Sequence, residues 1–384
     1  MELKKKYKTV LPLCGSCKVE ILDRRLNQNC RARNTDCQEK TFSKSSHMAA
    51  INDGNAELPS CTSRWTEDNL KQLQISPLKS RVYTAKEIIS LSLNEEADKR
   101  VYKIDDHFYR YMPYGFVALD FDDFYSVKYE TVYSLLYDAN GHQMPSFKLE
   151  SLPEYTDQHW CNMFRVYGEQ FCKHLIYMAW QRERGVSISA CMFQQLFQHF
   201  TAMFGLHSIG LPSLHQEQVR IKNTDVRSTP NLSFCNPPSY EKDSLKTYAI
   251  CTVKKLHSEE KLESPESPPT KQRRRGEEVV QGVVSHLCPD LIGQHGGQLF
   301  VHFQNRSENQ LGLLGFIVQD TNVTFTHFSC EDEDYDLMIK GKAAFPEGSN
   351  PVIKFSRPYN YLKSEDRLHI IQPLLKLGFV QSIL

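Results

Sequence analysis

The sequence predicts an α+β protein: an aromatic-rich β segment with a helical hairpin, then an antiparallel sheet flanked by helices, interrupted by a disordered insert. Three observations support this: aromatic and β-branched clusters between turn signals, two long stretches with helical apolar spacing, and polar stretches too poor in apolar residues to fold. The two ordered regions form either one composite domain or two separate domains. The sequence divides into an N-terminal arm (1–98), the β segment with the helical hairpin (99–206), the disordered insert (207–277) and a C-terminal α+β region (278–384).

Residues 1–98 are predicted to be a mostly disordered N-terminal arm that contains several cysteines. Polar residues dominate from residue 27 to residue 69, and no apolar periodicity is sustained there. Near the end of the arm, Thr84 is followed three positions later by Glu87, which is typical of a capping box. This pair predicts a short helix over residues 84–93.

Residues 99–206 begin with an aromatic block. Twelve aromatic residues fall within 101–137 around a Met-Pro-Tyr-Gly turn, which predicts two strands and then a helix or third strand. Apolar residues at helical spacing predict an amphipathic helix over 157–182. A second helix is expected to begin at Ser187 or Ser189 and to end at Gly205, and the short connection predicts an antiparallel hairpin.

Residues 207–277 are polar and punctuated by proline, which predicts a disordered insert with one short strand at 247–253. Beyond them, apolar runs separated by turn-like residues predict a second ordered region. Pro373 is expected to kink or split its last helix. The elements expected there are a helix at 278–287, strands at 299–303, 313–319, 323–328, 337–343 and 352–355, and a helix at 364–377.

Composition limits the classes of function. The 384 residues include 46 basic and 46 acidic side chains, so the formal net charge is zero, which argues against coating of nucleic acid or anionic membranes. No apolar run has the roughly 18 residues that a membrane span needs, and the start does not resemble a secretory signal. We therefore expect an intracellular protein without a membrane partner, whose 12 cysteines are reduced.

The N-terminal arm contains a candidate zinc site. Cys14 and Cys17 flank Gly-Ser in a C-x2-C turn that lets two thiolates point at one Zn²⁺, and Cys30 and Cys37 would complete a tetrahedral set. Several lysines and arginines surround these cysteines. One hypothesis is therefore a nucleic-acid-binding protein with a zinc-stabilised basic arm, and the alternative is a flexible arm with free thiols.

An acidic motif suggests a second hypothesis. Asp120 and Asp122 follow an apolar run, and phosphotransfer sites often place carboxylates at a strand end in this way to hold Mg²⁺. The sequence contains no coherent catalytic constellation to accompany them. A Mg²⁺-dependent phosphotransfer enzyme is therefore the alternative to a protein without enzymatic activity.

The predicted insert carries the third signal. Lys271, Arg273, Arg274 and Arg275 form a compact basic cluster of the kind that nuclear import receptors bind. Ser-Pro phosphorylation sites at Ser264 and Ser267 precede the cluster, and Ser76 begins a further kinase-type motif, Ser-Pro-Leu-Lys.

These signals favour a non-enzymatic nuclear adaptor that binds other proteins and is regulated by phosphorylation of its linker. Its expected partners are other nuclear proteins and a nuclear import receptor, and shuttling between nucleus and cytoplasm is consistent with phosphorylation beside the basic cluster. Nucleic acid is a less favoured partner, because acidic residues outnumber basic ones in the aromatic block.

Overall fold

A computed structural model of the chain describes residues 57–93, 116, 119–137, 155–210, 213–214, 216–236, 246–256, 286–308, 310–342, 345 and 350–383. All of these residues belong to one compact unit, 57–384, and the other unit, 1–56, lies outside the described residues.

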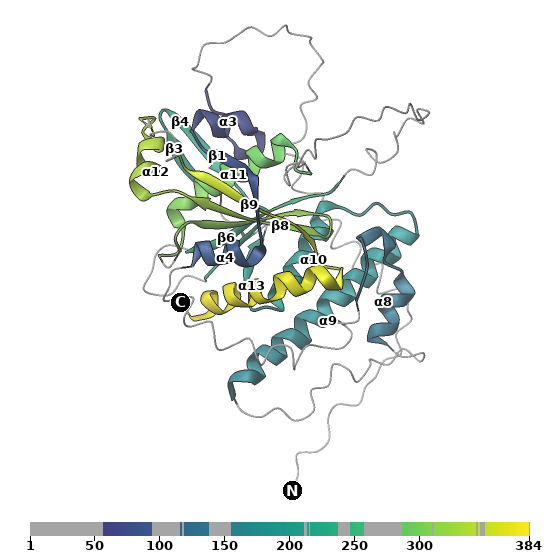
Figure 1. Cartoon of the computed structure of the whole chain (residues 1–384). Coiled ribbons are helices and arrows are strands. Elements are labelled where there is room, and N and C mark those ends of the chain that lie inside the picture. Colours follow the sequence, from purple (N-terminus) through teal and green to yellow (C-terminus); the bar gives the residue numbers. More distant parts are fainter. Residues whose placement is uncertain are drawn as a thin grey trace, which may run out of the picture. The chain divides into compact units, whose positions relative to one another are not determined.

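Helices and strands alternate irregularly along the described chain (Figure 1). The strands are β1 (Ser76–Tyr83), β2 (Ser208–Gly210), β3 (Glu217–Ile221), β4 (Thr224–Ser228), β5 (Leu232–Cys235), β6 (Thr247–Lys254), β7 (Leu313–Gln319), β8 (Asn322–Ser329) and β9 (Val352–Asn360). The α-helices are α3 (Glu67–Gln72), α4 (Ala85–Ser92), α8 (Tyr129–Leu136), α9 (Tyr155–Glu183), α10 (Ala190–Ala202), α11 (Pro289–His302), α12 (Asp332–Ile339) and α13 (Ser364–Ile383). Short 3-10 turns are η1 (Thr62–Arg64), η2 (Phe124–Ser126) and η5 (Phe303–Asn305).

Seven strands form the main sheet in the order β1-β9-β8-β7-β6-β5-β2, and β3 and β4 form a separate ribbon. The pairs β1–β9 and β6–β7 are parallel, whereas the other pairs of the main sheet are antiparallel. The α+β class is therefore confirmed, with a mixed sheet. The parallel pairs arise because long stretches of chain separate β1 from β9 and β6 from β7, so that neither pair is a hairpin.

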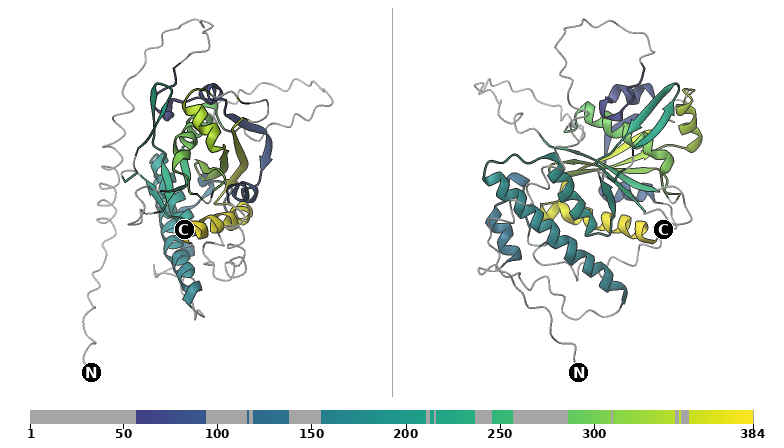
Figure 2. Two further views of the ribbon diagram at one scale, coloured as in Figure 1. Left: turned by 90° about the vertical axis from the view of Figure 1, so that its left-hand side faces the viewer. Right: turned by 180° about the vertical axis from the view of Figure 1, so that it is seen from behind.

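Each face of the sheet carries its own apolar core. Along β7, Leu314, Phe316 and Val318 point into the larger core, while Leu313 and Ile317 point into the other. Helices α4, α10 and α13 cover the first face. Helix α9 packs on α10, and α8 packs on α9. Helix α11 covers the opposite face together with α3 and the β3–β4 ribbon (Figure 2).

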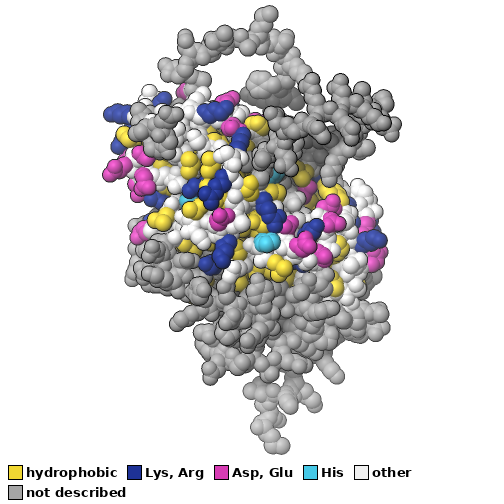
Figure 3. All heavy atoms as spheres, in the orientation of Figure 1, with side chains coloured by type: hydrophobic (Ala, Val, Ile, Leu, Met, Phe, Trp, Pro, Cys, Tyr) yellow, Lys and Arg dark blue, Asp and Glu magenta, His cyan; other side chains and the backbone are white. Residues whose placement is uncertain are grey.

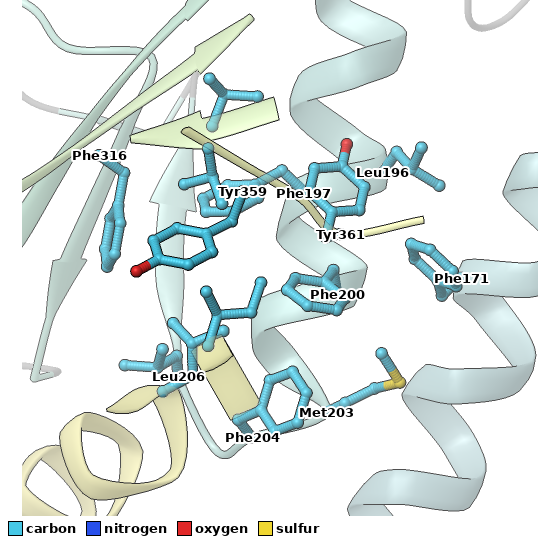
Figure 4. Packing of buried hydrophobic residues seen from close by; sticks show 14 of the residues in the cluster. Phe171, Leu196, Phe197, Phe200, Met203, Phe204, Leu206, Phe316, Tyr359 and Tyr361 are labelled. Atoms are coloured by element: carbon cyan, nitrogen blue, oxygen red, sulfur yellow. The ribbon is translucent and has the colours of Figure 1, made fainter. Parts of the chain in front are cut away.

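Aromatic rings dominate the larger core (Figure 4). The rings of Phe200 and Tyr361 stack with centroids 4.9 Å apart, and Phe197 meets Phe316 edge-on at 5.7 Å. Helix α10, the strand β7 and the end of β9 are thereby joined through one cluster of rings. Such aromatic pairs add to the free energy gained by burial of their surface.

Helices α9 and α10 form the predicted hairpin. The ring centroids of Phe164 and Phe204 are 5.8 Å apart, and those of Phe171 and Phe200 are 5.9 Å apart. Later residues of α9 therefore contact earlier residues of α10, so the two helices run in opposite directions. Gly185, with a φ of 73°, follows the end of α9, because an L side chain rarely adopts that backbone conformation. This arrangement confirms the antiparallel prediction.

The capping-box helix is also confirmed. The hydroxyl oxygen of Thr84 accepts a hydrogen bond of 3.1 Å from the N–H of Glu87, and the Glu87 carboxylate accepts one of 2.7 Å from the N–H of Thr84. The last helix, α13, extends to Ile383 and contains Pro373 without a break, so the predicted split does not occur.

The strand predicted at 299–303 is wrong, because these residues are helical within α11 and η5. Helix α11 is buried on nearly all sides, so its apolar residues are not confined to one face, and the run Leu299–Val301 resembles a buried strand. Glycines let the helix approach its neighbours: a Cβ atom at Gly297 would lie 2.6 Å from the Trp65 ring, and one at Gly293 would lie 2.1 Å from the backbone of Thr66.

The strand predicted at 337–343 is wrong as well, because α12 occupies Asp332–Ile339. Three acidic residues in its first turn stabilise the helix, because they lie at the positive end of its dipole. Its buried residues, Tyr335 and Met338, are three positions apart and therefore share one face. Gly341, with a φ of 66°, follows the end of this helix.

Two segments predicted to be disordered contain regular structure. Residues 57–93 of the arm hold α3, β1 and α4, and their burial of Trp65, Leu70 and Ile75 in the smaller core offsets the entropy of ordering. Residues 208–235 hold β2 to β5, and in β3 and β4 the alternation of exposed and buried residues matches a strand. The strand predicted at 247–253 corresponds to β6.

The remaining predictions are only partly covered by the described residues. Of the aromatic block, α8 corresponds to the expected helix, whereas the two expected strands fall mostly on residues outside the described ranges. The helix predicted at 278–287 and residues 257–277 also lie largely or wholly outside those ranges.

Candidate functional site

Asp120, proposed from the sequence as a magnesium ligand, lies at the start of α13. Its Oδ1 accepts a hydrogen bond of 2.8 Å from the backbone N–H of Ser364, the first residue of that helix. This bond, assisted by the positive charges of Arg367 and Lys363, lowers the pKa of Asp120. Asp120 therefore caps a helix N-terminus, where unpaired N–H groups and the helix dipole stabilise a carboxylate.

Asp122, the other proposed ligand, lies on the surface beside the same helix. Its Oδ1 lies 3.2 Å from Nζ of Lys363, and its side chain is 86% exposed. The side-chain amide of Asn360 donates a hydrogen bond of 2.5 Å to the backbone carbonyl of Asp122. The structure thus gives both aspartates contacts that attach residues 119–123 to the end of β9 and the start of α13.

A buried arginine completes this attachment. The guanidinium of Arg367 donates hydrogen bonds to the backbone carbonyls of Leu119, Tyr361 and Leu362, and it lies 5.0 Å from the centroid of the Phe116 ring. Burial lowers its pKa to about 10, so the group remains protonated at neutral pH. We call Asp120, Asp122, Arg367 and their partners the α13 clasp.

A second polar cluster lies between α11 and the sheet, and sequence reasoning missed it. The ring of His295 is within 2.8 Å of the hydroxyl groups of Thr252 and Thr326, through Nδ1 and Nε2 respectively. Thr252 donates a hydrogen bond of 2.5 Å to the amide oxygen of Gln298. A Cβ atom at Gly315 would lie 2.6 Å from the His295 ring, so only glycine leaves room for it on β7.

The hydrogen bonds fix the tautomer of His295. Because the Thr252 proton goes to Gln298, the Thr252 oxygen accepts from Nδ1–H of His295, and Nε2 accepts the hydroxyl proton of Thr326. Burial lowers the pKa of His295 to about 3. The cluster is closed to solvent, so we assign it a structural role. Its sequence signal was the presence of polar residues, Thr252 and Thr326, inside two predicted apolar strands.

Surface aromatic rings on α8 and α9 form the strongest candidate site for a partner. On α8 and at its C-terminal end, the rings of Tyr129, Tyr133 and Tyr137 follow each other at 5.6 Å and 4.8 Å, and all three are half-buried. Spacing of four residues places them on one side of the helix. Val132 and Leu136 are the fully buried residues of α8, and Tyr129 and Tyr137 also pack partly against the larger core.

A second group of rings lies near the C-terminal end of α9, the helix on which α8 packs. Tyr177 stacks on Trp180 at 6.2 Å, and the guanidinium of Arg184 lies 4.0 Å from the centroid of the Trp180 ring. A carboxylate oxygen of Glu183 accepts a hydrogen bond of 2.9 Å from the N–H of Tyr129, which fixes the start of α8 on α9. We call the rings of both helices, with Arg184, the α8–α9 aromatic surface.

Two further histidines lie between α9 and α10. Nε2 of His174 bonds to the carbonyl oxygen of Met192 at 3.0 Å, and its ring lies 5.7 Å from that of His199. Burial lowers the pKa of His174 to about 4. The pair therefore joins α9 to α10.

Most sequence-predicted site residues lie outside the described ranges. These are the proposed zinc ligands, the basic cluster and the two linker serines: Cys14, Cys17, Cys30, Cys37, Lys271, Arg273, Arg274, Arg275, Ser264 and Ser267. Among the residues that are described, no three His, Cys, Asp or Glu side chains are grouped to hold a metal. Ser76 is exposed at the first position of β1, and its N–H donates to the carbonyl of Pro351 at 2.9 Å.

Comparisons with protein families, curated proteins and solved structures find no match for this chain. In the described part of the chain, no helix is long and apolar enough to cross a membrane.

Proposed function

We propose that the protein is a non-enzymatic adaptor of the nucleus, which binds other proteins and is regulated by phosphorylation of its linker. The observation that carries the proposal is the α8–α9 aromatic surface. Tyrosine, tryptophan and arginine are the residues in which binding energy at protein interfaces is most often concentrated. A row of half-buried rings presents a large rigid surface, and its ordering on binding costs little entropy.

The α13 clasp supports the same class of function. The acidic motif was the main sequence feature in favour of phosphotransfer, and its aspartates have structural partners in α13 and Lys363. The motif is therefore accounted for without a metal ion. The alternative is a Mg²⁺-dependent phosphotransfer enzyme that uses Asp120 and Asp122, and substitution of these two residues tests it.

Loss of the rings is expected to abolish capture of partners. The double substitution Tyr133→Ala and Tyr137→Ala should reduce recovery of the captured proteins from nuclear extract at least tenfold, since losing one such anchor costs about 2 kcal/mol. Affinity purification of the tagged full chain with quantitative mass spectrometry measures this. Tyr125→Ala removes an exposed ring outside the surface and is the matched control.

The double substitution Asp120→Asn and Asp122→Asn is expected to leave capture unchanged. Asparagine keeps an oxygen that can accept the hydrogen bond from Ser364, so the fold should be only mildly perturbed. A Mg²⁺-dependent hydrolysis or nucleotidyl transfer that wild type performs and this variant does not would replace the adaptor by the runner-up. Equal capture by wild type and the tyrosine variant would remove the aromatic surface from the proposal.

Nuclear import is expected to depend on the basic cluster. Replacement of Arg273, Arg274 and Arg275 by Ala should shift a fluorescent fusion from nucleus to cytoplasm, because these side chains would make the charge-assisted contacts to an acidic receptor groove. Ser264→Glu with Ser267→Glu should weaken import less, since added carboxylates offset the charge without removing the donors. The thermal melt should not change. A triple-Ala fusion that remains fully nuclear would contradict the nuclear assignment.

A further inference from the structure

We infer that the outer edge of β1 is a docking site for an extended acidic segment of a partner protein, which adds to the sheet as a further strand. The inference gives the proposed adaptor a second binding surface, separate from α8 and α9, and its test does not depend on nuclear location. Three features support it: β1 is the last strand of the sheet, β1 and β9 carry basic but no acidic residues, and Lys354 has no acidic partner among the described residues.

Strand β1 ends the sheet. It pairs with β9 on one side, and no described residue pairs with its other side. The N–H of Ser76 bonds to Pro351 on the β9 side, so the backbone of Pro77 faces the outer edge by strand alternation; beyond Leu78 the register with β9 shifts. Proline at an outward position costs the sheet no hydrogen bond. Free backbone groups of such an edge are the usual template for strand addition.

The charge of this edge selects the partner. Strands β1 and β9 carry Lys79, Arg81, Lys354 and Arg357 and no acidic residue. Figure 3 shows several Lys and Arg side chains over the region of β1, β9 and α4. Cations on an edge strand prevent pairing with a neutral or basic chain, and a cation that has no acidic partner of its own attracts an acidic one.

Lys354 is the cation of this group that lacks a counter-charge in the structure. Lys79 pairs with Glu67 at 2.6 Å, Arg81 with Glu87 at 3.4 Å and Arg357 with Asp366 at 2.8 Å. No such partner is present for Lys354 within the described residues.

Lys354 lies on β9, one strand in from the free edge. It stands opposite Leu78 of β1 in the parallel register, half-buried. Burial and the charge of Arg81 together lower its pKa, so an approaching carboxylate would relieve an unfavourable interaction. An acidic side chain on an added strand can satisfy Lys354 while the backbone pairs with β1.

Binding of a synthetic strand to the full chain tests the inference. The probe is a fluorescein-labelled ten-residue peptide of alternating Glu and Val, and binding is followed by fluorescence anisotropy. The same peptide with Lys in place of Glu should bind at least about tenfold more weakly. The electrostatic attraction that guides the Glu peptide to the edge, and its ion pair with Lys354, would both become repulsion. A version with central prolines should also fail to bind, because proline cannot donate to the ladder.

Substitution of the unpaired cation locates the site. Lys354→Glu is expected to weaken binding of the Glu-Val peptide about tenfold, and Lys354→Gln about threefold, which fits a partly exposed ion pair. Lys254→Glu is the matched control: Lys254 is exposed at the end of β6, which β7 and β8 separate from β9. That variant should change binding less than about twofold, as a distant rim charge does.

Hydrogen exchange completes the test. Saturating peptide should slow amide exchange in residues 78–83 of the wild-type chain, as strand addition requires. Equal binding of the Glu and Lys peptides, equal effects of Lys354→Glu and Lys254→Glu, or binding without protection of β1 would each overturn the inference. A dimer that forms through β1 in the absence of peptide would show that a second copy, and not an acidic partner, occupies the edge.

Discussion

A change from about pH 7.5 to about pH 5.5 is expected to lower the free energy of unfolding by roughly 5 kcal/mol. Four histidines cause this loss, of which His295, His302 and His327 are buried and His174 is half-buried. Burial lowers the pKa of His295 and His327 to about 3 and that of His174 and His302 to about 4. Each should contribute about 1.4 kcal/mol over this interval.

The sign follows from which state binds the protons. In the unfolded chain these histidines take up a proton near their ordinary pKa of about 6.5, whereas in the folded chain they stay neutral until the pH is far lower. The unfolded state therefore binds more protons between about pH 6.5 and the folded values, so stability falls as the pH falls. Glu87 and Asp120 have lowered pKa values, and their loss of stabilisation begins only nearer pH 4.

Urea unfolding at the two pH values, followed by circular dichroism, measures the effect. His302→Gln should reduce the pH dependence by about a quarter, since it removes one of four similar contributions. His302 is suited to this because its Nε2 has no hydrogen-bond partner in the structure, so the substitution breaks no bond there. His369→Gln, at an exposed position of α13, should leave the pH dependence as it is. Equal stability of wild type at both pH values would contradict the prediction.

Local sequence signals predicted much of this fold. The Thr84–Glu87 box, the apolar spacing of α9 and α10, and the turn before β8 each depend on residues close together in the chain. Such signals survive folding because the hydrogen bonds and turns concerned are themselves local. The strands β7 and β8 were predicted for the same reason, as apolar runs joined by a two-residue turn that begins at Asp320, whose φ is 53°.

Features that depend on distant residues were not predicted. Helix α11 is buried almost all round because the sheet, α3 and the β3–β4 ribbon enclose it, and the apolar run at its C-terminal end does not distinguish this environment from that of a buried strand. Strand β1 carries Pro77 and few apolar residues, so only its pairing with β9 makes it a strand. Asp120 resembled a metal ligand because its partner Ser364 lies 244 positions away in the sequence.

Disruption of the α13 clasp is expected to have the second large effect. Arg367→Met should lower the free energy of unfolding by about 3 to 5 kcal/mol, because methionine fills the space but leaves buried carbonyl groups without their donor. Those groups belong to Leu119, Tyr361 and Leu362, which come from both sides of the junction between residues 119–123 and α13. The arginine is 3% exposed, so water cannot replace its hydrogen bonds.

Urea unfolding at neutral pH distinguishes the clasp from an ordinary surface charge. Arg81→Met removes an arginine of which 63% of the side chain is exposed, together with its ion pair to Glu87, and should cost less than about 1 kcal/mol. Asp120→Asn should also cost little, since the amide oxygen can still accept from Ser364, whereas Asp120→Ala should cost about 1 kcal/mol as an uncapped helix does. If Arg367→Met were no more destabilising than Arg81→Met, the acidic motif would lose its structural explanation. Asp120 and Asp122 would then again require a functional one.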